Sequence, residues 1–303
     1  MDPLIVLFGF GVGVLVGLTG VGGGSLMTPI LILVFGFKPV TAVGTDIAYG
    51  AITKTVGGWR HFKQHTVNQS LSTWMAFGSV PSAVAGVYGL DALEESTGKS
   101  FDNTVLTAVA CALVFTGVML LARATFLPKT VAREREELVL ERRHKLAAVL
   151  LGVSVGFVLG VTSAGSGSLI AVGLIMLFRL APRQVVGTDV FHAAILLWAA
   201  AIAHVVAGNV DYGLAGTILL GSIPGVWIGS QWSARTPVAA LRTGLGVIML
   251  GAALGLLSKA GAEIPGFVLA AVPLILFVVI TAPHVRRRWF GPVPSPPAAA
   301  PER

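Results

Sequence analysis

Long apolar stretches separated by short polar segments fill most of the chain. A helix that crosses a membrane needs about 20 apolar residues. Stretches of about that length are residues 39–59, 71–90, 105–121, 185–206, 214–232, 241–257 and 264–282. Two further stretches, 4–37 and 146–178, are too long for one simple span and carry runs of glycine. The pattern therefore predicts an all-α polytopic membrane protein.

The chain also contains the same sequence pattern twice. The segment GLTGVGGGSL at 17–26 returns as GVTSAGSGSL at 160–169, which is 143 residues later. At the same spacing, GTD at 44–46 recurs at 187–189 and GSVP at 78–81 becomes GSIP at 221–224. Such matching marks a duplicated structural unit. Because both copies are apolar and interrupted by glycine at the same place, they indicate a transporter built from two repeats.

Composition excludes a water-soluble fold. The chain is 54% hydrophobic and 12% charged, with a mean hydropathy of +0.84, whereas soluble domains have about 25% charged residues. The net charge of +7 could suggest nucleic acid as a partner, but the basic residues lie in short loops at the ends of apolar stretches. There they set the orientation of the spans, and we expect no nucleic-acid partner.

Positive charges predict that the two copies are inverted. The basic clusters at 133–145 and 286–288 are expected on the cytoplasmic side, which makes 146–178 a hairpin that begins and ends there. Arg60, His61 and Lys63 place the end of 39–59 inside, opposite to its counterpart 185–206. Each inverted repeat then has a glycine-broken re-entrant helical hairpin plus several transmembrane helices. The alternative is that each hairpin is one kinked span.

This topology divides the chain into four parts. We predict membrane repeat 1 at residues 1–123, a cytoplasmic amphipathic linker at 124–145, membrane repeat 2 at 146–283 and a basic, disordered cytoplasmic tail at 284–303.

The glycine-rich hairpin turns are the predicted substrate site. Each arm before a turn has about 15 residues, or about 22 Å of helix, which places the turn inside the membrane. A broken helix there frees backbone N–H groups that can face an anion. The predicted substrate-binding residues of the two turns are Thr19, Gly22, Gly23, Gly24, Ser25, Thr162, Gly165, Ser166, Gly167 and Ser168. The alternative is that these small residues only permit close helix packing.

Asp46 and Asp189 form a second candidate site, in which they are grouped with the preceding Thr45 and Thr188. A carboxylate inside a span is costly, yet it occurs at equivalent positions of both copies. His192 lies one helical turn from Asp189, and the two together could carry a proton. The alternative is that each aspartate accepts hydrogen bonds from the hairpin turn and holds the repeat together.

Lys54 lies about two turns from either end of its predicted span, and its counterpart is Leu197. An intramembrane cation would attract an anionic substrate, so Lys54 is also a predicted substrate-binding residue. A contact with Asp46, two turns away, would instead make it structural.

Several segments together resemble the TauE/SafE sulfite exporter family: GLTGVGGGSLMTPIL at 17–31, AVGTDIA at 42–48, VVGTDVF at 185–191 and GSIPGVWIG at 221–229. The resemblance implies a multi-pass carrier of the cell inner membrane for a small anion such as sulfite, a sulfonate or a related organic acid. It also implies coupling to an ion gradient, with the proton expected and sodium as the alternative. The sequence leaves a homo-oligomer open.

Other functional classes fit less well. An anion channel with re-entrant filter loops is the main alternative. An intramembrane serine protease would use Ser166 or Ser168 with a histidine, but the first copy has Gly23 and Tyr49 at the positions of Ser166 and His192. We therefore expect no enzyme activity, no cofactor and no metal site.

Overall fold

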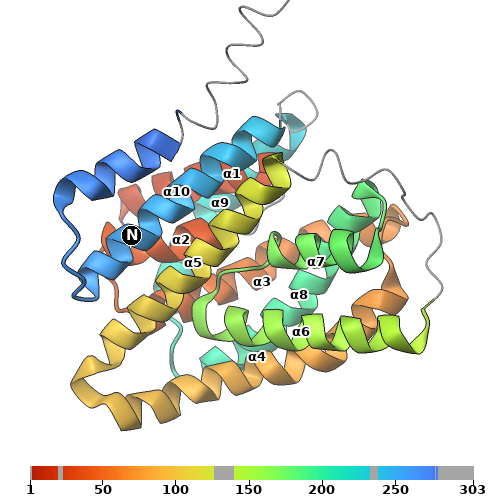
Figure 1. Ribbon diagram of the computed structural model, residues 1–303, viewed down its shortest axis with the longest axis horizontal. Helices are drawn as coiled ribbons and strands as arrows, with labels where there is room; N and C mark the ends of the chain where they lie inside the picture. Colours follow the sequence, from red (N-terminus) through yellow and green to blue (C-terminus); the bar gives the residue numbers. More distant parts are fainter. Residues whose placement is uncertain (1, 20–22, 126–139, 233–237, 277, 279–303) are drawn as a thin grey trace, which may run out of the picture.

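A computed structural model describes residues 2–19, 23–125, 140–232, 238–276 and 278. These residues form helices joined by short connections (Figure 1). The first half contains α1 (Pro3–Thr19), α2 (Gly24–Leu33), α3 (Pro39–Lys63), α4 (Gln69–Thr97) and α5 (Phe101–Thr125). The second half contains α6 (Arg142–Thr162), α7 (Leu169–Phe178), α8 (Pro182–Val206), α9 (Tyr212–Trp232) and α10 (Val238–Lys259). The 3-10 turn Gly98–Ser100 joins α4 to α5.

The two halves have the same order of helices, with a short helix second in each. α3 and α8 each have 25 residues and a proline at the first helical position, where its missing N–H costs nothing. Pro39 and Pro182 are 143 residues apart, as are the first residues of α4 and α9. The sequence repeat is therefore also a repeat of helices.

Within the described residues, five helices are long and apolar enough to cross a membrane: Phe101–Ala122, Arg142–Thr162, Pro182–Val206, Tyr212–Trp232 and Leu241–Lys259. Predicted spans 105–121, 185–206, 214–232 and 241–257 lie within them. Predicted spans 39–59 and 71–90 fall in α3 and α4, which are helices but are not among the five because their polar residues lower the mean hydropathy. From predicted span 264–282 the structure describes the apolar helix Gly266–Leu276.

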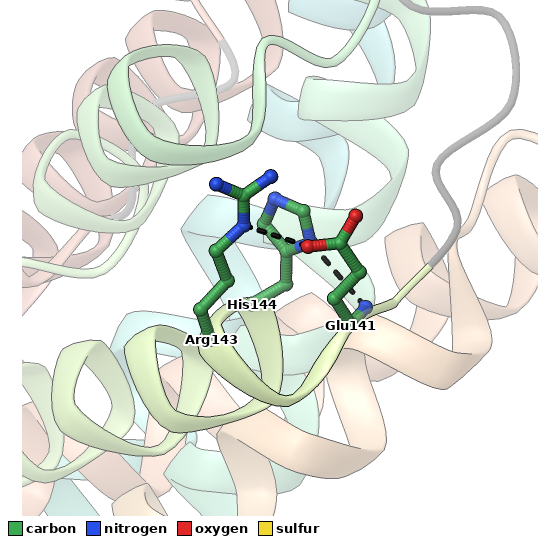
Figure 2. Close-up of polar contacts among 3 residues, drawn as sticks. All are labelled: Glu141, Arg143 and His144. Atoms are coloured by element: carbon green, nitrogen blue, oxygen red, sulfur yellow. Dashed lines mark hydrogen bonds and ion pairs between the residues drawn. The ribbon is translucent and has the colours of Figure 1, made fainter.

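α6 begins earlier than the sequence predicts. Figure 2 shows the start of this helix, where the Arg143 guanidinium pairs with the Glu141 carboxylate over 2.7 Å and the Glu141 backbone N–H donates to His144 Nδ1 over 3.4 Å. Because Glu141 caps the helix, α6 has 21 residues, and the predicted arm of about 15 is too short. The segment 126–139 of the predicted linker and the tail 284–303 lie outside the described residues.

Helices of one half pack mainly on helices of the other. α1 lies along α9, and the two helices run parallel because Gly9 meets Ile218 and Gly13 meets Ser222. α4 lies along α6, and these two helices are parallel as well. α3 and α8 run antiparallel, because Gly50 meets Leu197 while Phe62, later in α3, stacks on the earlier Phe191. α5 and α10 are also antiparallel. In these two pairs, equivalent helices of the two halves thus run in opposite directions; Figure 1 shows α5 and α10 side by side.

Glycines at four-residue spacing bring the parallel pairs into backbone contact. A Cβ built at Gly9 would lie 2.8 Å from the carbonyl oxygen of Ile218, closer than two such atoms approach. Small residues at this spacing let membrane helices approach closely. The glycines of these contacts are Gly9, Gly13 and Gly17 on α1, Gly221, Gly225 and Gly229 on α9, Gly78 and Gly86 on α4, and Gly152, Gly156 and Gly160 on α6.

Some charged side chains are buried between the helices, while many large apolar side chains are exposed. Asp46, Lys54 and His192 are 1%, 6% and 0% exposed, whereas Val56 and Trp227 are 72% and 67% exposed. Polar groups therefore lie between the helices and large apolar side chains cover the outside, as expected for a protein surrounded by lipid.

Candidate functional site

Two helix breaks lie where the sequence predicts them. α1 ends at Thr19 and α2 begins at Gly24, while α6 ends at Thr162 and α7 begins at Leu169. Ser25 and Ser168, the last residues of the two predicted turns, each lie within one residue of the observed helix start. Gly22 lies outside the described residues, and the structure does not place it.

The second break depends on left-handed backbone conformations. Gly165 and Gly167 have φ values of +112° and +96°, which side chains disfavour. Ser163 also has a positive φ of +58°, and its backbone N–H still donates to Leu159 O over 2.8 Å as the end of α6. The glycines of this break are therefore needed for its conformation as well as for close packing.

The two breaks touch each other. Gly24, at the start of α2, lies against Ser163, and a Cβ at Gly24 would be 2.6 Å from Ser163 Oγ and would also collide with the carbonyl oxygen of Ser163. The same atom would be 3.2 Å from Asp46 Oδ2. The breaks of the two halves thus meet beside Asp46.

Asp46 joins these breaks through its carboxylate. Thr28 Oγ1 of α2 donates to Asp46 Oδ2 over 2.5 Å, and Ser163 Oγ of the other half donates to the same oxygen over 2.8 Å. This geometry favours the structural interpretation of Asp46, with the hydroxyls of Thr28 and Ser163 among its donors. Asp46 Oδ1 is buried and has no hydrogen-bond partner in the described chain.

A valine in place of Thr28 should lower the melting temperature of the purified protein by several degrees. The substitution keeps the shape of the side chain but removes a hydrogen bond to a buried carboxylate, a type of bond that contributes about 1.5–3 kcal/mol. Thr116→Val is the matched control, because the equally buried Thr116 hydroxyl donates only to Ala112 O of its own helix. Equal melting temperatures for the two variants would show that Asp46 does not depend on Thr28.

His192 faces α4 through both ring nitrogens. Ser72 Oγ lies 3.4 Å from His192 Nδ1 and Ser79 Oγ lies 3.1 Å from His192 Nε2. The imidazole is fully buried, so the predicted partnership with Asp189 is replaced by contacts with two serines. Its counterpart Tyr49 reaches the first break, where a Cβ at Gly23 would lie 2.6 Å from the tyrosine hydroxyl.

Lys54 is buried in α3 and faces α8. The carboxylate of Asp189 on α8 acts electrostatically on its ammonium. A cation from one half and a carboxylate from the other are brought together inside the protein.

Thr45 and Thr188 hold the loops of the opposite half. Thr45 Oγ1 accepts from the backbone N–H of Asp211 over 3.0 Å, and Thr188 Oγ1 accepts from that of Asn68 over 2.9 Å. Asn68 and Asp211 in turn cap the starts of α4 and α9. The threonine of each GTD motif thus positions a helix start, and the preceding glycine lets that loop approach.

The hydroxyl groups of the two breaks divide into two kinds. Thr19 Oγ1 donates to Leu15 O over 2.7 Å and Thr162 Oγ1 donates to Val158 O over 2.6 Å. Each threonine is the last residue of its helix, and its hydroxyl donates to the backbone of that same helix. Ser25 Oγ and Ser168 Oγ, at equivalent positions of α2 and α7, are both buried and have no hydrogen-bond partner among the residues that the structure describes. Ser166 is also buried.

Comparison with known proteins identifies relatives of the chain. A family model described as "Sulfite exporter TauE/SafE" matches residues 5–256. Probable membrane transporter protein YjnA of Bacillus subtilis is 43% identical over 235 residues, which are 78% of this chain and 91% of that protein. Probable membrane transporter protein YdhB of the same organism is 26% identical over 80% of this chain and 94% of its own length. No solved structure matches the chain.

Proposed function

The chain belongs to the TauE/SafE sulfite exporter family and is a multi-pass membrane transporter, and we propose that it moves a small anion by secondary active transport. The substrate on this proposal is sulfite, a sulfonate or a related organic acid, and the location is the cell inner membrane. The family is one of transporters, which argues against the protease alternative.

Inverted repeats are the second part of the proposal. The equivalent helices α3 and α8 run antiparallel, and so do α5 and α10. Antiparallel equivalent helices support a pseudo-twofold axis in the plane of the membrane, the arrangement of many secondary transporters. On this proposal α1–α2 and α6–α7 are hairpins that enter from opposite faces. Rocking one repeat against the other would expose the site between them to each side in turn.

The substrate site on this proposal lies between the two helix breaks. The observation that carries it is the pair of buried serines, Ser25 and Ser168, whose hydroxyls have no partner within the described chain. A buried polar group without a partner is costly, and here it recurs at equivalent positions. Both serines lie at helix starts, where free N–H groups and the helix dipole favour an anion. An anion between the breaks would satisfy both hydroxyls.

The coupling ion is proposed to be a proton, with sodium as the alternative. Asp189 is buried beside a cation. Its surroundings also differ from those of Asp46, because the position of Thr28 on α2 is occupied by Ala171 on α7. This difference favours Asp189 over Asp46 as the group that gains and loses a proton.

Ser168→Ala and Ser25→Ala should each weaken anion binding by about 10- to 100-fold. Each removes one hydrogen bond to a charged ligand, worth about 1.5–3 kcal/mol. The measurement is a thermal-shift panel on detergent-purified protein with sulfite, sulfoacetate, taurine, sulfolactate, lactate, sulfate and methanesulfonate. A bound anion stabilises the folded state by mass action.

Ser154→Ala is the control for this panel, because the exposed Ser154 hydroxyl donates only to Leu150 O of its own helix. Undiminished affinity in both break variants would contradict the site. No stabilisation of the wild type by any anion would contradict the proposed function. Flux that saturates with the anion that binds would favour a carrier over a channel.

A further inference from the structure

We propose that Lys54 and Asp189 form a buried charge pair that the anionic substrate opens, taking the place of the Asp189 carboxylate beside the Lys54 ammonium. The inference rests on the proposed transport function. The repeat creates two equivalent half-sites, one in each half of the protein, but only one of them contains a lysine. The inference places the negative group of the substrate in that half-site.

The packing of α3 on α8 directs Lys54 toward this pair. Lys54 lies one turn from Gly50 and one turn from Gly58, so the three residues share a face of α3. Gly50 lies against Leu197, and a Cβ built at Gly58 would lie 3.3 Å from Phe191 Cα. Both flanking positions therefore face α8, and the lysine between them faces it too.

Asp189 lies on the part of α8 that this face meets. A Cβ at Gly57 would be 3.0 Å from a methyl carbon of Val190, the neighbour of Asp189 in the chain. Lys54 and Asp189 are 6% and 3% exposed. Because the glycines on this face carry no side chain, α8 packs directly against α3 on both sides of Lys54.

The other half has no such pair. Leu197 stands at the position of Lys54, and the counterpart of Asp189 is Asp46. Asp46 Oδ2 already accepts two hydroxyl protons, from Thr28 and Ser163. One carboxylate is thus held by neutral donors that tie the two breaks together, whereas the other is opposed by the Lys54 ammonium. The charge-bearing half-site is the one where Lys54 of α3 faces α8.

Charge balance explains why the exchange is feasible. A buried charge without a partner is strongly unfavourable, whereas a buried pair is tolerated. When an anion replaces Asp189 beside Lys54, the cation stays paired, and a proton taken up by Asp189 leaves no unbalanced carboxylate. One monovalent anion then enters together with one proton.

Few other ionisable groups can influence this pair. α7 contains none, and α4 contributes no charged side chain between Gln69 and Leu90. His192 on α8 faces the serines of α4. Near the end of α3, His61 interacts electrostatically with Arg60, with Lys54 and with Arg183 of α8.

The test is a double-mutant cycle on full-length purified protein, with sulfite and methanesulfonate as probes and affinity measured by calorimetry and thermal shift. Lys54→Leu, which installs the residue of the other half, should weaken binding at least ten-fold. Asp189→Asn should tighten it several-fold, because the internal competitor for Lys54 is neutral. The double variant should recover the wild-type melting temperature but bind as weakly as Lys54→Leu. Asp46→Asn, the matched control, should not tighten binding.

A purely structural pair gives a different result. Both single variants would then bind more weakly than the wild type, and the double variant would regain wild-type affinity along with its stability, which would overturn the inference. If a single variant does not fold, the affinity of the folded double variant decides between the two outcomes. If neither probe binds the wild type, the proposed function itself fails and the inference fails with it.

Discussion

Gly221→Ala is expected to lower the melting temperature of the purified protein by roughly 6–12 °C, corresponding to a loss of about 3 kcal/mol at 2–4 °C per kcal/mol. The new methyl group would collide with the carbonyl oxygen of Val6 and lie 2.8 Å from the backbone nitrogen of Phe10. These atoms belong to the backbone of α1 and cannot rotate away as a side chain can. α1 and α9 must separate, and this loosens every contact that the glycines make between the two helices.

Gly216→Ala is the matched control, since it introduces the same methyl group on the same helix. No atom lies within 4 Å of a Cβ at Gly216. The control should leave the melting temperature unchanged or raise it slightly, because alanine favours a helix over glycine by up to about 1 kcal/mol. Equal melting temperatures for the two variants would show that α1 and α9 do not approach each other this closely.

Asp189→Asn is expected to make transport insensitive to a pH gradient. If Asp189 carries the proton with the anion, flux toward the alkaline side of a vesicle is faster than flux without a gradient. Asparagine cannot take up a proton, so the variant should transport at equal rates in both conditions. The measurement is the initial rate of sulfite and methanesulfonate flux in vesicles of reconstituted protein, with and without an imposed pH gradient.

Asp46→Asn is the comparison variant for this experiment. Its carboxylate is held by Thr28 and Ser163, so the variant should lose stability but keep its response to the gradient. A variant at Asp189 that still accelerates with the gradient would remove that residue from proton coupling. A response that depends on sodium in the wild type would replace the proton as the coupling ion.

Local signals in the sequence predicted the two helix breaks well. Glycines at repeated positions act on their own segment of backbone, so the ends of α1 and α6 and the starts of α2 and α7 lie close to their predicted places. The extra length of α6 was missed because Glu141, a charged residue in a predicted linker, caps the helix with its neighbours. A cap of this kind is visible only when the side chains are placed.

Partnerships between distant segments were not predictable from the spacing alone. The glycines of α1 at every fourth position are visible in the sequence, but nothing local shows that they meet α9. Lys54 was compared with Asp46 because both lie on α3, whereas its partner Asp189 comes from the other half. Thr28, Ser163 and Ser79 were missed for the same reason, although Ser163 and Ser79 lie within repeated segments and Thr28 lies next to one.

The pairing of α1 with α9 and of α4 with α6 also sets the order in which the protein can assemble on the ribosome. The 74 residues between Gly78 and Gly152 require about 4–15 s of synthesis at 5–20 residues per second, whereas the 212 residues between Gly9 and Gly221 require about 10–40 s. The first helix to be made is therefore among the last to find its partner. Until then the face of α1 that carries the glycines is exposed to lipid or is covered by an insertion factor.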